Sequence, residues 1–194
     1  MKSAIKTKET ISGFILAGGK SSRMKSDKAL LLIQGEPLLG RMTRLLKPFC
    51  QTVAISGNNP DHEDFNLEMV RDLYPGCGPI SGIFSSLKHS STQWNLLVSV
   101  DVPFINEDFL QTMVSGIGNF DCIIPEHEGK VEPLMGLYNK QIIPILEEMI
   151  GQGDYKLMNL LSKLNVRYLN CNNMAKKFPR LFLNMNSPED YQSI

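Results

Sequence analysis

Short apolar runs alternate with amphipathic segments along almost the whole chain, and this alternation narrows the range of folds open to it more than any other feature. The run 11–16 ends in Ala17-Gly18-Gly19, and the run 94–100 is almost continuously apolar. A strand of that kind is expected where helices cover both faces of a sheet. Alternating strands and helices are typical of α/β proteins, so we predict an α/β fold with a mostly parallel sheet.

The apolar pattern and the capping residues predict the remaining elements. Pro37 should open a helix, because its missing N–H is not needed in the first turn, and Asn106 should cap another. The order Ser187-Pro188-Glu189-Asp190 predicts a last helix start. Further helices are expected near residues 80–87, 142–150 and 155–164, and further strands at residues 52–56, 67–70, 120–125, 131–138, 166–169 and 181–183.

The length and composition suit a single domain with an ordinary core. The chain has 194 residues, of which 42% are hydrophobic and 21% charged. Residues 1–10 are polar, and we interpret them as a flexible leader, so residues 11–194 are expected to form one domain. The leader lacks the apolar stretch of a signal peptide, and no window approaches the roughly 20 apolar residues of a membrane span. We therefore expect a cytoplasmic protein.

The charges, cysteines and histidines argue against several functional classes. The formal net charge is zero, and nothing in the sequence indicates an electrostatic contact with nucleic acid or a membrane. No two cysteines form a CxxC pair, so neither a zinc site nor a disulfide framework is expected. We interpret the histidines as surface or loop residues and assign them no role. The residues concerned are Cys50, Cys77, Cys122, Cys171, His62, His89 and His127.

A loop rich in glycine and basic residues follows the first predicted strand. Gly18 and Gly19 let the backbone approach a ligand closely, and Arg23 and Lys28 add positive charge. The loop is not a P-loop, because Phe14 stands where the first glycine of that motif is required. The glycines alone favour a tight turn before a solvated loop. With the two basic residues included, a polyphosphate site is favoured.

A second loop, at residues 71–82, contains three glycines and two prolines before a predicted helix. Such a rigid loop can pack against a flat ligand, and it can equally serve as a sharp connection. Asp72 lies at a strand end, where its carboxylate could accept hydrogen bonds from a base or a sugar. This segment alone leaves both interpretations open.

Asp101 directly follows the most continuously apolar predicted strand. Open α/β sheets bind ligands at the carboxyl ends of their strands, where Asp101 is expected. A carboxylate buried there without a partner would be unfavourable, which indicates a cationic partner or a metal. Mg²⁺ is often held by one or two carboxylates plus substrate phosphates. A helix cap or a salt bridge is the alternative, and we favour the metal role because two other ligand-like loops also follow strands.

Two later segments are weaker candidates for a second substrate. Asn184 and Asn186 precede a predicted helix start, where capping and turn formation are the default roles of asparagine. A role beside an acceptor substrate is the more specific alternative. Residues 132–134 could line an acceptor pocket or simply open a strand.

The chain resembles the molybdenum cofactor guanylyltransferases, within the broader MobA-like NTP transferase superfamily. Residues 16–30, LAGGKSSRMKSDKAL, are similar to the family signature LAGG-x-S-x-RMG-x-DK-x-L. The elements PGxGPxxGI, xxDxP and NxNxPED follow in family order, and the resemblance runs from about residue 11 to the C-terminus. It implies a three-layer, Rossmann-like nucleotidyltransferase fold, with residues 11–194 as a single nucleotidyltransferase domain.

The resemblance implies a nucleotide site built from matching positions. The backbone at Leu16, Ala17 and Gly18 would meet the nucleobase, and Gly19 would meet the phosphates. Asp72 falls where the family binds the nucleotide.

The same resemblance implies the catalytic and acceptor positions. Lys28 resembles the lysine that contacts the nucleotide phosphates, and Arg23 resembles its basic neighbour. Asp101 falls on the family's Mg²⁺ and nucleotide ligand and completes the implied catalytic set. Asn184 and Asn186 match a C-terminal pair on the acceptor side.

The sequence departs from the family pattern at several positions. Lys25 replaces a glycine, and Ser56 stands where some members carry a nucleotide-binding asparagine, for which Asn58 is a nearby substitute. Glu132 replaces a different polar residue on the expected acceptor side. Gly18 favours the branch that uses guanine, because cytidylyl relatives tend to read LAAG.

The resemblance implies that GMP passes from Mg-GTP to the terminal phosphate of molybdenum-molybdopterin, with release of pyrophosphate and with Mg²⁺ as the cofactor. A cytidylyltransferase for the same pterin and a sugar-phosphate nucleotidyltransferase are alternatives with the same chemistry. A non-catalytic nucleotide-binding partner is an alternative of another class. We also expect a monomer or weak oligomer that meets molybdoenzyme chaperones or other cofactor-synthesis proteins.

Overall fold

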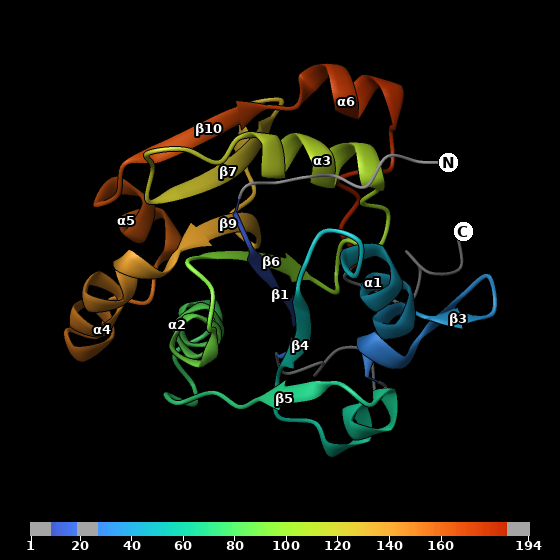
Figure 1. Cartoon of the computed structure of the whole chain (residues 1–194), viewed down its shortest axis with the longest axis horizontal. Coiled ribbons are helices and arrows are strands. Elements are labelled where there is room, and N and C mark those ends of the chain that lie inside the picture. The colour runs from blue at the N-terminus through green and yellow to red at the C-terminus, as the bar shows by residue number, and fades with distance from the viewer. Residues whose placement is uncertain (1–8, 19–26, 186–194) are drawn as a thin grey trace.

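The computed structural model describes residues 9–18 and 27–185 (Figure 1). The strands are β1 (Ile11–Leu16), β2 (Leu32–Ile33), β3 (Glu36–Pro37), β4 (Thr52–Ser56), β5 (Glu68–Val70), β6 (Trp94–Ser99), β7 (Cys122–His127), β8 (Lys130–Val131), β9 (Met135–Asn139) and β10 (Val166–Asn170). The α-helices are α1 (Leu38–Leu46), α2 (Pro79–His89), α3 (Glu107–Ser115), α4 (Ile143–Gly151), α5 (Leu157–Ser162) and α6 (Asn172–Lys177). The 3-10 helices are η1 (Lys28–Leu30), η2 (Pro60–Phe65) and η3 (Lys140–Ile142).

One mixed, mostly parallel sheet forms the centre of the molecule (Figure 1). Its strands run in the order β10-β7-β9-β6-β1-β4-β5, and β8 pairs with β7. Strand β9 is antiparallel to both of its neighbours, β6 and β7, while β1, β4, β5 and β6 are mutually parallel. The carboxyl ends of β10, β7, β6, β1, β4 and β5 therefore all lie along one edge of the sheet.

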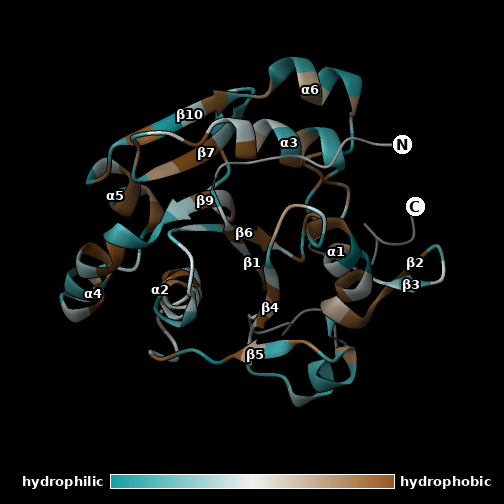
Figure 2. Ribbon diagram, viewed as in Figure 1, coloured by the Kyte–Doolittle hydropathy of each residue, from teal (hydrophilic) through white to brown (hydrophobic). Residues whose placement is uncertain are grey.

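Helices cover both faces of this sheet, so the predicted three-layer α/β fold is confirmed. Successive side chains of a strand point to opposite faces, and the residues of β1 follow this rule. Ile11 and Ile15 pack in a core with α1 and α3, whereas Phe14 packs in a second core with α2, α4 and α5. Figure 2 shows that hydrophobic residues concentrate in the central strands, while α6 at the periphery is largely hydrophilic. The predicted central strand, β6, is buried along its whole length.

Two of the predicted helix starts can be compared with the structure in detail. Asn106 caps α3 as expected, and its Oδ1 accepts a hydrogen bond of 2.9 Å from the backbone N–H of Phe109. Pro37 precedes α1 rather than occupying its first turn, because its ψ of 141° is extended. The helix then begins at Leu38.

The predicted strand at residues 181–183 is wrong. The N–H of Leu181 bonds to the carbonyl of Phe178 at 2.9 Å, and the N–H of Leu183 bonds to Arg180 at 3.0 Å, so this segment is a series of turns. Its apolar residues are explained by packing: Leu181 is buried, and the ring of Phe182 meets that of Phe109 edge-on at 5.8 Å.

The sequence pattern also missed short elements and shifted others. Helix α6, the hairpin β2–β3 and helix η2 were not expected, and β7 begins two positions after its predicted start. The predicted helix start at Ser187 and the leader up to Lys8 lie outside the described residues. Within the described part of the chain, no helix combines the length and the apolar character needed to cross a membrane.

Candidate functional site

The loops that follow β1, β4, β5 and β6 converge at the carboxyl edge of the sheet. The carbonyl of Leu16 accepts a bond of 3.1 Å from the N–H of Val100, and the N–H of Ala17 donates to the carbonyl of Ser56 at 2.9 Å. The N–H of Gly57 reaches the carbonyl of Val70 at 3.0 Å. Three segments were predicted separately to bind a nucleotide. These backbone bonds bring them together at one edge of the sheet.

Gly57 allows the closest of these approaches. A side chain at this position would place its Cβ 3.3 Å from the carbonyl oxygen of Ala17 and 3.4 Å from the nitrogen of Gly18, both of which are backbone atoms. Gly57 directly follows the strand predicted at residues 52–56. Gly18 itself is exposed, so its backbone is open to a ligand at the edge.

Lys28 and Asp101 meet at this edge, although they are far apart in sequence. The Nζ of Lys28 lies 3.1 Å from Oδ1 of Asp101, and the two side chains are 15% and 33% exposed. Helix η1 presents the lysine directly after its N-cap, Asp27. The N–H of Asp101 donates to Ser99 Oγ at 3.2 Å, which fixes the backbone that carries the carboxylate. A partly exposed cation and anion in contact form a suitable site for phosphates and their counter-ions.

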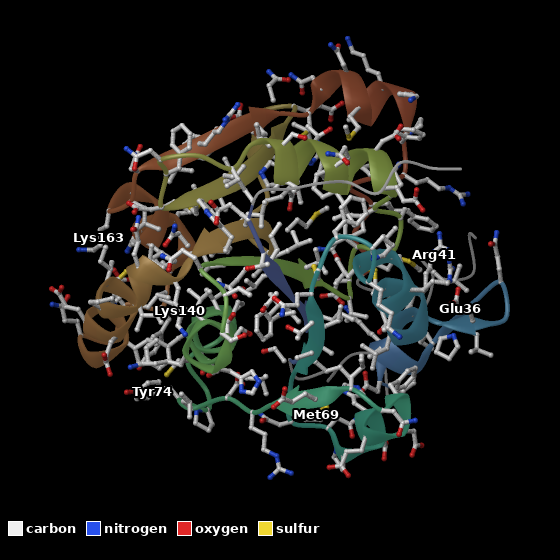
Figure 3. The ribbon with its side chains drawn as sticks, viewed as in Figure 1. Glu36, Arg41, Met69, Tyr74, Lys140 and Lys163 are labelled. Carbon is white, nitrogen blue, oxygen red and sulfur yellow. The ribbon has the colours of Figure 1, made fainter. Side chains whose placement is uncertain are left out.

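Helix α1 and the C-terminal end of the described chain also hold the segment around Asp101. Arg41 of α1, labelled in Figure 3, donates from Nε to the carbonyl of Pro103 at 3.2 Å. The N–H of Met185 donates to the carbonyl of Asp101 at 2.8 Å, so the C-terminal part of the described chain also reaches this edge. Neither contact uses the Asp101 side chain, which leaves its carboxylate for Lys28 and a ligand.

Asp72 lies at the same edge, beyond the end of β5. Its Oδ2 accepts a bond of 3.3 Å from Nδ2 of Asn58, and its N–H donates to Oδ1 of Asn58 at 3.2 Å. Burial raises the pKa of the Asp72 carboxyl, and the hydrogen bond from Asn58 partly opposes that rise. A Cβ on Gly82 would lie 3.3 Å from Ser56 Oγ and 3.9 Å from Asp72 Oδ1, so the first turn of α2 packs closely here.

The segments predicted for the acceptor side are also neighbours of Asp101. Asn184 is exposed and directly precedes Met185, whose N–H contacts Asp101. The carbonyl of Leu134 accepts from the N–H of Ser99 at 2.8 Å, which places residues 132–134 next to the end of β6. Sequence reasoning had left these segments as separate candidates.

The interpretation of the histidines as surface or loop residues is wrong for two of them. His62 is fully buried, and its Nε2 lies 2.8 Å from Oδ2 of Asp27. His127 is nearly buried, with Nε2 3.2 Å from Oε1 of Glu132 and its ring stacked on Phe182 at 3.9 Å. Nothing in the polar run around His62 marks it as buried, since its partner is distant in sequence.

Three residues of the predicted site lie outside the described part of the chain: Gly19, Arg23 and Asn186. Their roles, and that of Lys25, stay predictions. The structure brings the others to one edge, namely Leu16, Ala17, Gly18, Lys28, Asp72, Asp101 and Asn184.

The chemistry of Asp101 fits a divalent cation that takes most of its ligands from elsewhere. Among the described residues, no group of three or more His, Cys, Asp or Glu side chains is arranged to hold a metal ion. A single carboxylate can hold a cation when phosphate oxygens and water supply further ligands. This is the coordination that Mg²⁺ commonly adopts in nucleotide sites.

Replacing Asp72 with asparagine is expected to weaken nucleotide binding without lowering thermal stability at pH 7–8. Because the folded pKa of Asp72 lies above the ordinary value of about 3.9, its contribution to stability is largest below that value and is lost as the pH rises through the folded pKa. The variant's melting temperature should therefore equal or exceed that of wild type at neutral pH. Thermal scans and calorimetric GTP titrations at several pH values measure both effects.

Asp154 provides a control, because its pKa is shifted in the opposite direction to that of Asp72. Hydrogen bonds from Asn159 and from the N–H of Lys156 lower the pKa of its carboxyl, so Asp154 stabilises the fold above its ordinary pKa. Asp154→Asn should lower the melting temperature at neutral pH and leave nucleotide binding unchanged. If Asp72→Asn lowers the melting temperature at neutral pH as Asp154→Asn does, our account of Asp72 is wrong.

Comparisons with known proteins identify the family of the chain. Residues 13–168 match the model of the MobA-like NTP transferase domain. A probable molybdenum cofactor guanylyltransferase of Flavobacterium johnsoniae is 36% identical over 84% of this chain and 86% of its own, and one of Clostridium perfringens is 31% identical over 94% and 95%. The crystal structure of molybdopterin-guanine dinucleotide biosynthesis protein A from Archaeoglobus fulgidus is similar, with a TM-score of 0.79 and 25% identity over 94% of this chain and 95% of that one.

Nucleotidyltransferases of this family generally use a divalent metal. The matched region spans the strands β1, β4, β5 and β6, whose ends form the site, and includes Lys28 and Asp101. With the fold and the loop motif in agreement, the chain belongs to the family of MobA-like NTP transferase domains.

Proposed function

We propose that this protein transfers GMP from GTP to the terminal phosphate of molybdenum-molybdopterin, which forms the guanine dinucleotide form of the cofactor. The observation that carries the proposal is the contact of Lys28 with Asp101, beside the exposed backbone of Gly18 at the carboxyl edge. Relatives named as molybdenum cofactor guanylyltransferases, which this chain matches over most of its length, support the choice of substrates.

The reaction is a direct displacement at phosphorus. An oxygen of the acceptor's terminal phosphate attacks the α-phosphorus of GTP, a new P–O bond forms, and the bond to the bridging oxygen of the β-phosphate breaks. Pyrophosphate leaves with the electron pair of that bond. A phosphate acceptor is already ionised at neutral pH, so the reaction needs no strong general base and no protein nucleophile. Catalysis then depends on positioning and on electrostatic stabilisation.

Lys28 would place its positive charge where negative charge develops on the leaving pyrophosphate. Its ammonium is already fixed beside Asp101 Oδ1 at 3.1 Å, so little rearrangement is needed when phosphates bind. Arg23, from the preceding loop, is proposed to share this role. Asp101 would hold Mg²⁺, which when bound offsets the charge of the triphosphate.

The remaining residues at the edge would bind the nucleoside. The backbone at Ala17 and Gly18, held by the end of β4, offers hydrogen-bonding groups to a base. The Asp72 carboxylate, oriented by Asn58, can accept N–H or O–H groups from guanine or ribose. Asn184, beside the Asp101 segment, is proposed to contact the acceptor together with Asn186.

Calorimetric titration with GTP, CTP, ATP and UTP in the presence of Mg²⁺ tests the base preference. We expect the wild-type protein to bind GTP most tightly, because the Asp72 carboxylate accepts hydrogen bonds and guanine presents two adjacent N–H donors. CTP selectivity would keep the chemistry and identify a cytidylyltransferase instead. A folded protein that binds none of the four nucleotides would contradict the proposed activity and favour a non-catalytic role.

The domain organisation, location and partners of the protein complete the proposal. We propose residues 11–194 as one nucleotidyltransferase domain, and the sharing of a single sheet by β1 and β10 supports this. The cytoplasmic location, the monomeric or weakly oligomeric state and the contacts with chaperones or cofactor-synthesis proteins stay predictions.

A further inference from the structure

The carboxylate of Asp27 is held by donors from two separate segments. Its Oδ1 accepts a bond of 2.9 Å from the N–H of Ala29, which caps η1. Its Oδ2 lies 2.8 Å from Nε2 of His62 and also accepts a bond from Nδ2 of Asn59. Asp27 thereby joins the turn that carries Lys28 to the segment that follows β4.

Among the described residues, the His62 side chain makes its one hydrogen-bonding contact with this carboxylate, through Nε2. Its side chain is 0% exposed, and its Nδ1 meets no hydrogen-bonding partner among the described residues. A tautomer with the proton on Nδ1 would bury an unpaired N–H and turn the Nε2 lone pair toward the carboxylate. The geometry therefore requires a proton on Nε2, which donates to Asp27. An apolar side chain would fill this space without the free-energy cost of burying a polar ring. The hydrogen bond to Asp27 therefore explains why a histidine is buried here.

Asn59 and Asn58 extend the connection across the site. Oδ1 of Asn59 accepts a bond of 3.1 Å from the N–H of Asp61 and caps η2, while Nδ2 of Asn59 holds Asp27. The adjacent Asn58 holds Asp72 through its own Nδ2 at 3.3 Å. One short segment after β4 thus contacts both the turn that bears Lys28 and the carboxylate assigned to the nucleoside.

We propose that His62 and Asn59 are positioning residues for Lys28. They hold the Asp27 carboxylate, and with it the η1 turn that presents the Lys28 ammonium to Asp101. The inference rests on the proposed function, in which Lys28 acts on the nucleotide phosphates, but its structural content can be measured without any turnover.

The test compares two amide substitutions of His62 that differ in where they place a donor. Glutamine carries its amide nitrogen near the position of Nε2, so His62→Gln should keep the bond to Asp27. Asparagine carries its nitrogen near the position of Nδ1, so His62→Asn should lose that bond. His89→Asn is the matched control, because His89 pairs with the exposed Glu68 at 3.1 Å and has no contact with Asp27.

The first measurement is the rate at which trace acetic anhydride modifies Lys28, followed by peptide mass spectrometry and referred to Lys177 in the same molecule. Lys177 is a suitable reference because its side chain is 67% exposed and pairs with Asp108. We expect severalfold faster modification of Lys28 in His62→Asn, and wild-type rates in His62→Gln and His89→Asn. Equal rates in all four proteins would overturn the proposal whatever the enzyme's substrates are.

The second measurement is pyrophosphate release from GTP with molybdenum-molybdopterin. His62→Asn should lower kcat/KM by about 10- to 100-fold, the range typical for removing a residue that orients a metal ligand, and His62→Gln should stay near wild type. In a Lys28→Met background, His62→Asn should have little further effect, because it acts through Lys28. An equal loss in both backgrounds would indicate a purely structural histidine and would refute the proposal. Asn59→Ala gives the same comparison if His62→Asn does not fold.

Discussion

Replacing Asp101 with alanine is expected to abolish Mg²⁺-dependent GMP transfer. The carboxylate is the anionic partner of Lys28 at 3.1 Å and the proposed protein ligand of the metal, so the variant loses both interactions. We expect kcat/KM to fall by about 10³-fold or more, the upper end for one preorganised electrostatic group. GTP affinity in the presence of Mg²⁺ should weaken as well. Pyrophosphate release and calorimetric titration measure the two effects.

The structure also indicates that this variant should fold normally. The backbone N–H of Asp101 bonds to Ser99 Oγ, and its carbonyl accepts from Met185, and alanine retains both backbone groups. The Asp101 side chain is 33% exposed, so water can enter the space that it leaves beside Lys28. A melting temperature close to that of wild type would therefore accompany the loss of activity.

The pair formed by Asp108 and Lys177 supplies the control for this experiment. These residues form a similar ion pair at 3.0 Å, but their side chains are 58% and 67% exposed and lie on α3 and α6. Surface pairs of this kind contribute little to stability, so Asp108→Ala should leave both activity and folding unchanged. An Asp101→Ala enzyme with full activity would remove Asp101 from the catalytic set.

Much of the fold could be predicted because it depends on local sequence. Strand β6 is buried at every position and four of its six residues are apolar, because helices cover both of its faces, and β1 ends two positions before the pair Gly18-Gly19. The cap of α3 needs only Asn106 and the N–H of Phe109. These features are read from a few neighbouring residues, and each was predicted correctly.

The errors concern contacts between distant segments. Leu181 is apolar because it packs on the core and not because it belongs to a strand, and sequence periodicity cannot separate these causes over so short a run. The burial of His62 was missed because its hydrogen-bonding partner, Asp27, lies 35 positions away in the sequence. The pairing of β9 between β6 and β7 likewise depends on strands that the local pattern does not connect.

The candidate site could be predicted in part, because its residues lie in local motifs but their contacts join distant segments. The chain order of Lys28, Asp72 and Asp101, each beside a strand end or a glycine loop, was enough to nominate them. That they share one edge follows from the parallel sheet. The contact of Lys28 with Asp101, across 73 positions, is a tertiary fact that no motif specifies, and it changes the interpretation of both residues from separate ligands to an interacting pair.

Replacing Lys28 is expected to lower kcat/KM by about 10²-fold or more, because the enzyme loses one preorganised charge at the transferring phosphates. Lys28→Met is the sharper variant, since methionine keeps much of the apolar stem of this 15% exposed side chain and removes its charge. Lys28→Ala removes the stem as well. Similar losses in both variants would assign the effect to the ammonium group.

The distribution of the loss between kcat and KM tests how Lys28 acts. Loss of a contact that forms equally with bound GTP and with the transition state would raise KM and leave kcat unchanged, whereas loss of a contact that strengthens as pyrophosphate departs would lower kcat. We expect the second pattern, because the ammonium is already held at the edge by Asp101 and meets its largest negative charge only as the bond to the β-phosphate breaks. Lys177→Met, the same substitution in the exposed pair with Asp108, should change neither constant. A loss confined to KM would make Lys28 a binding residue and would leave Arg23 as the remaining candidate for stabilising the leaving group.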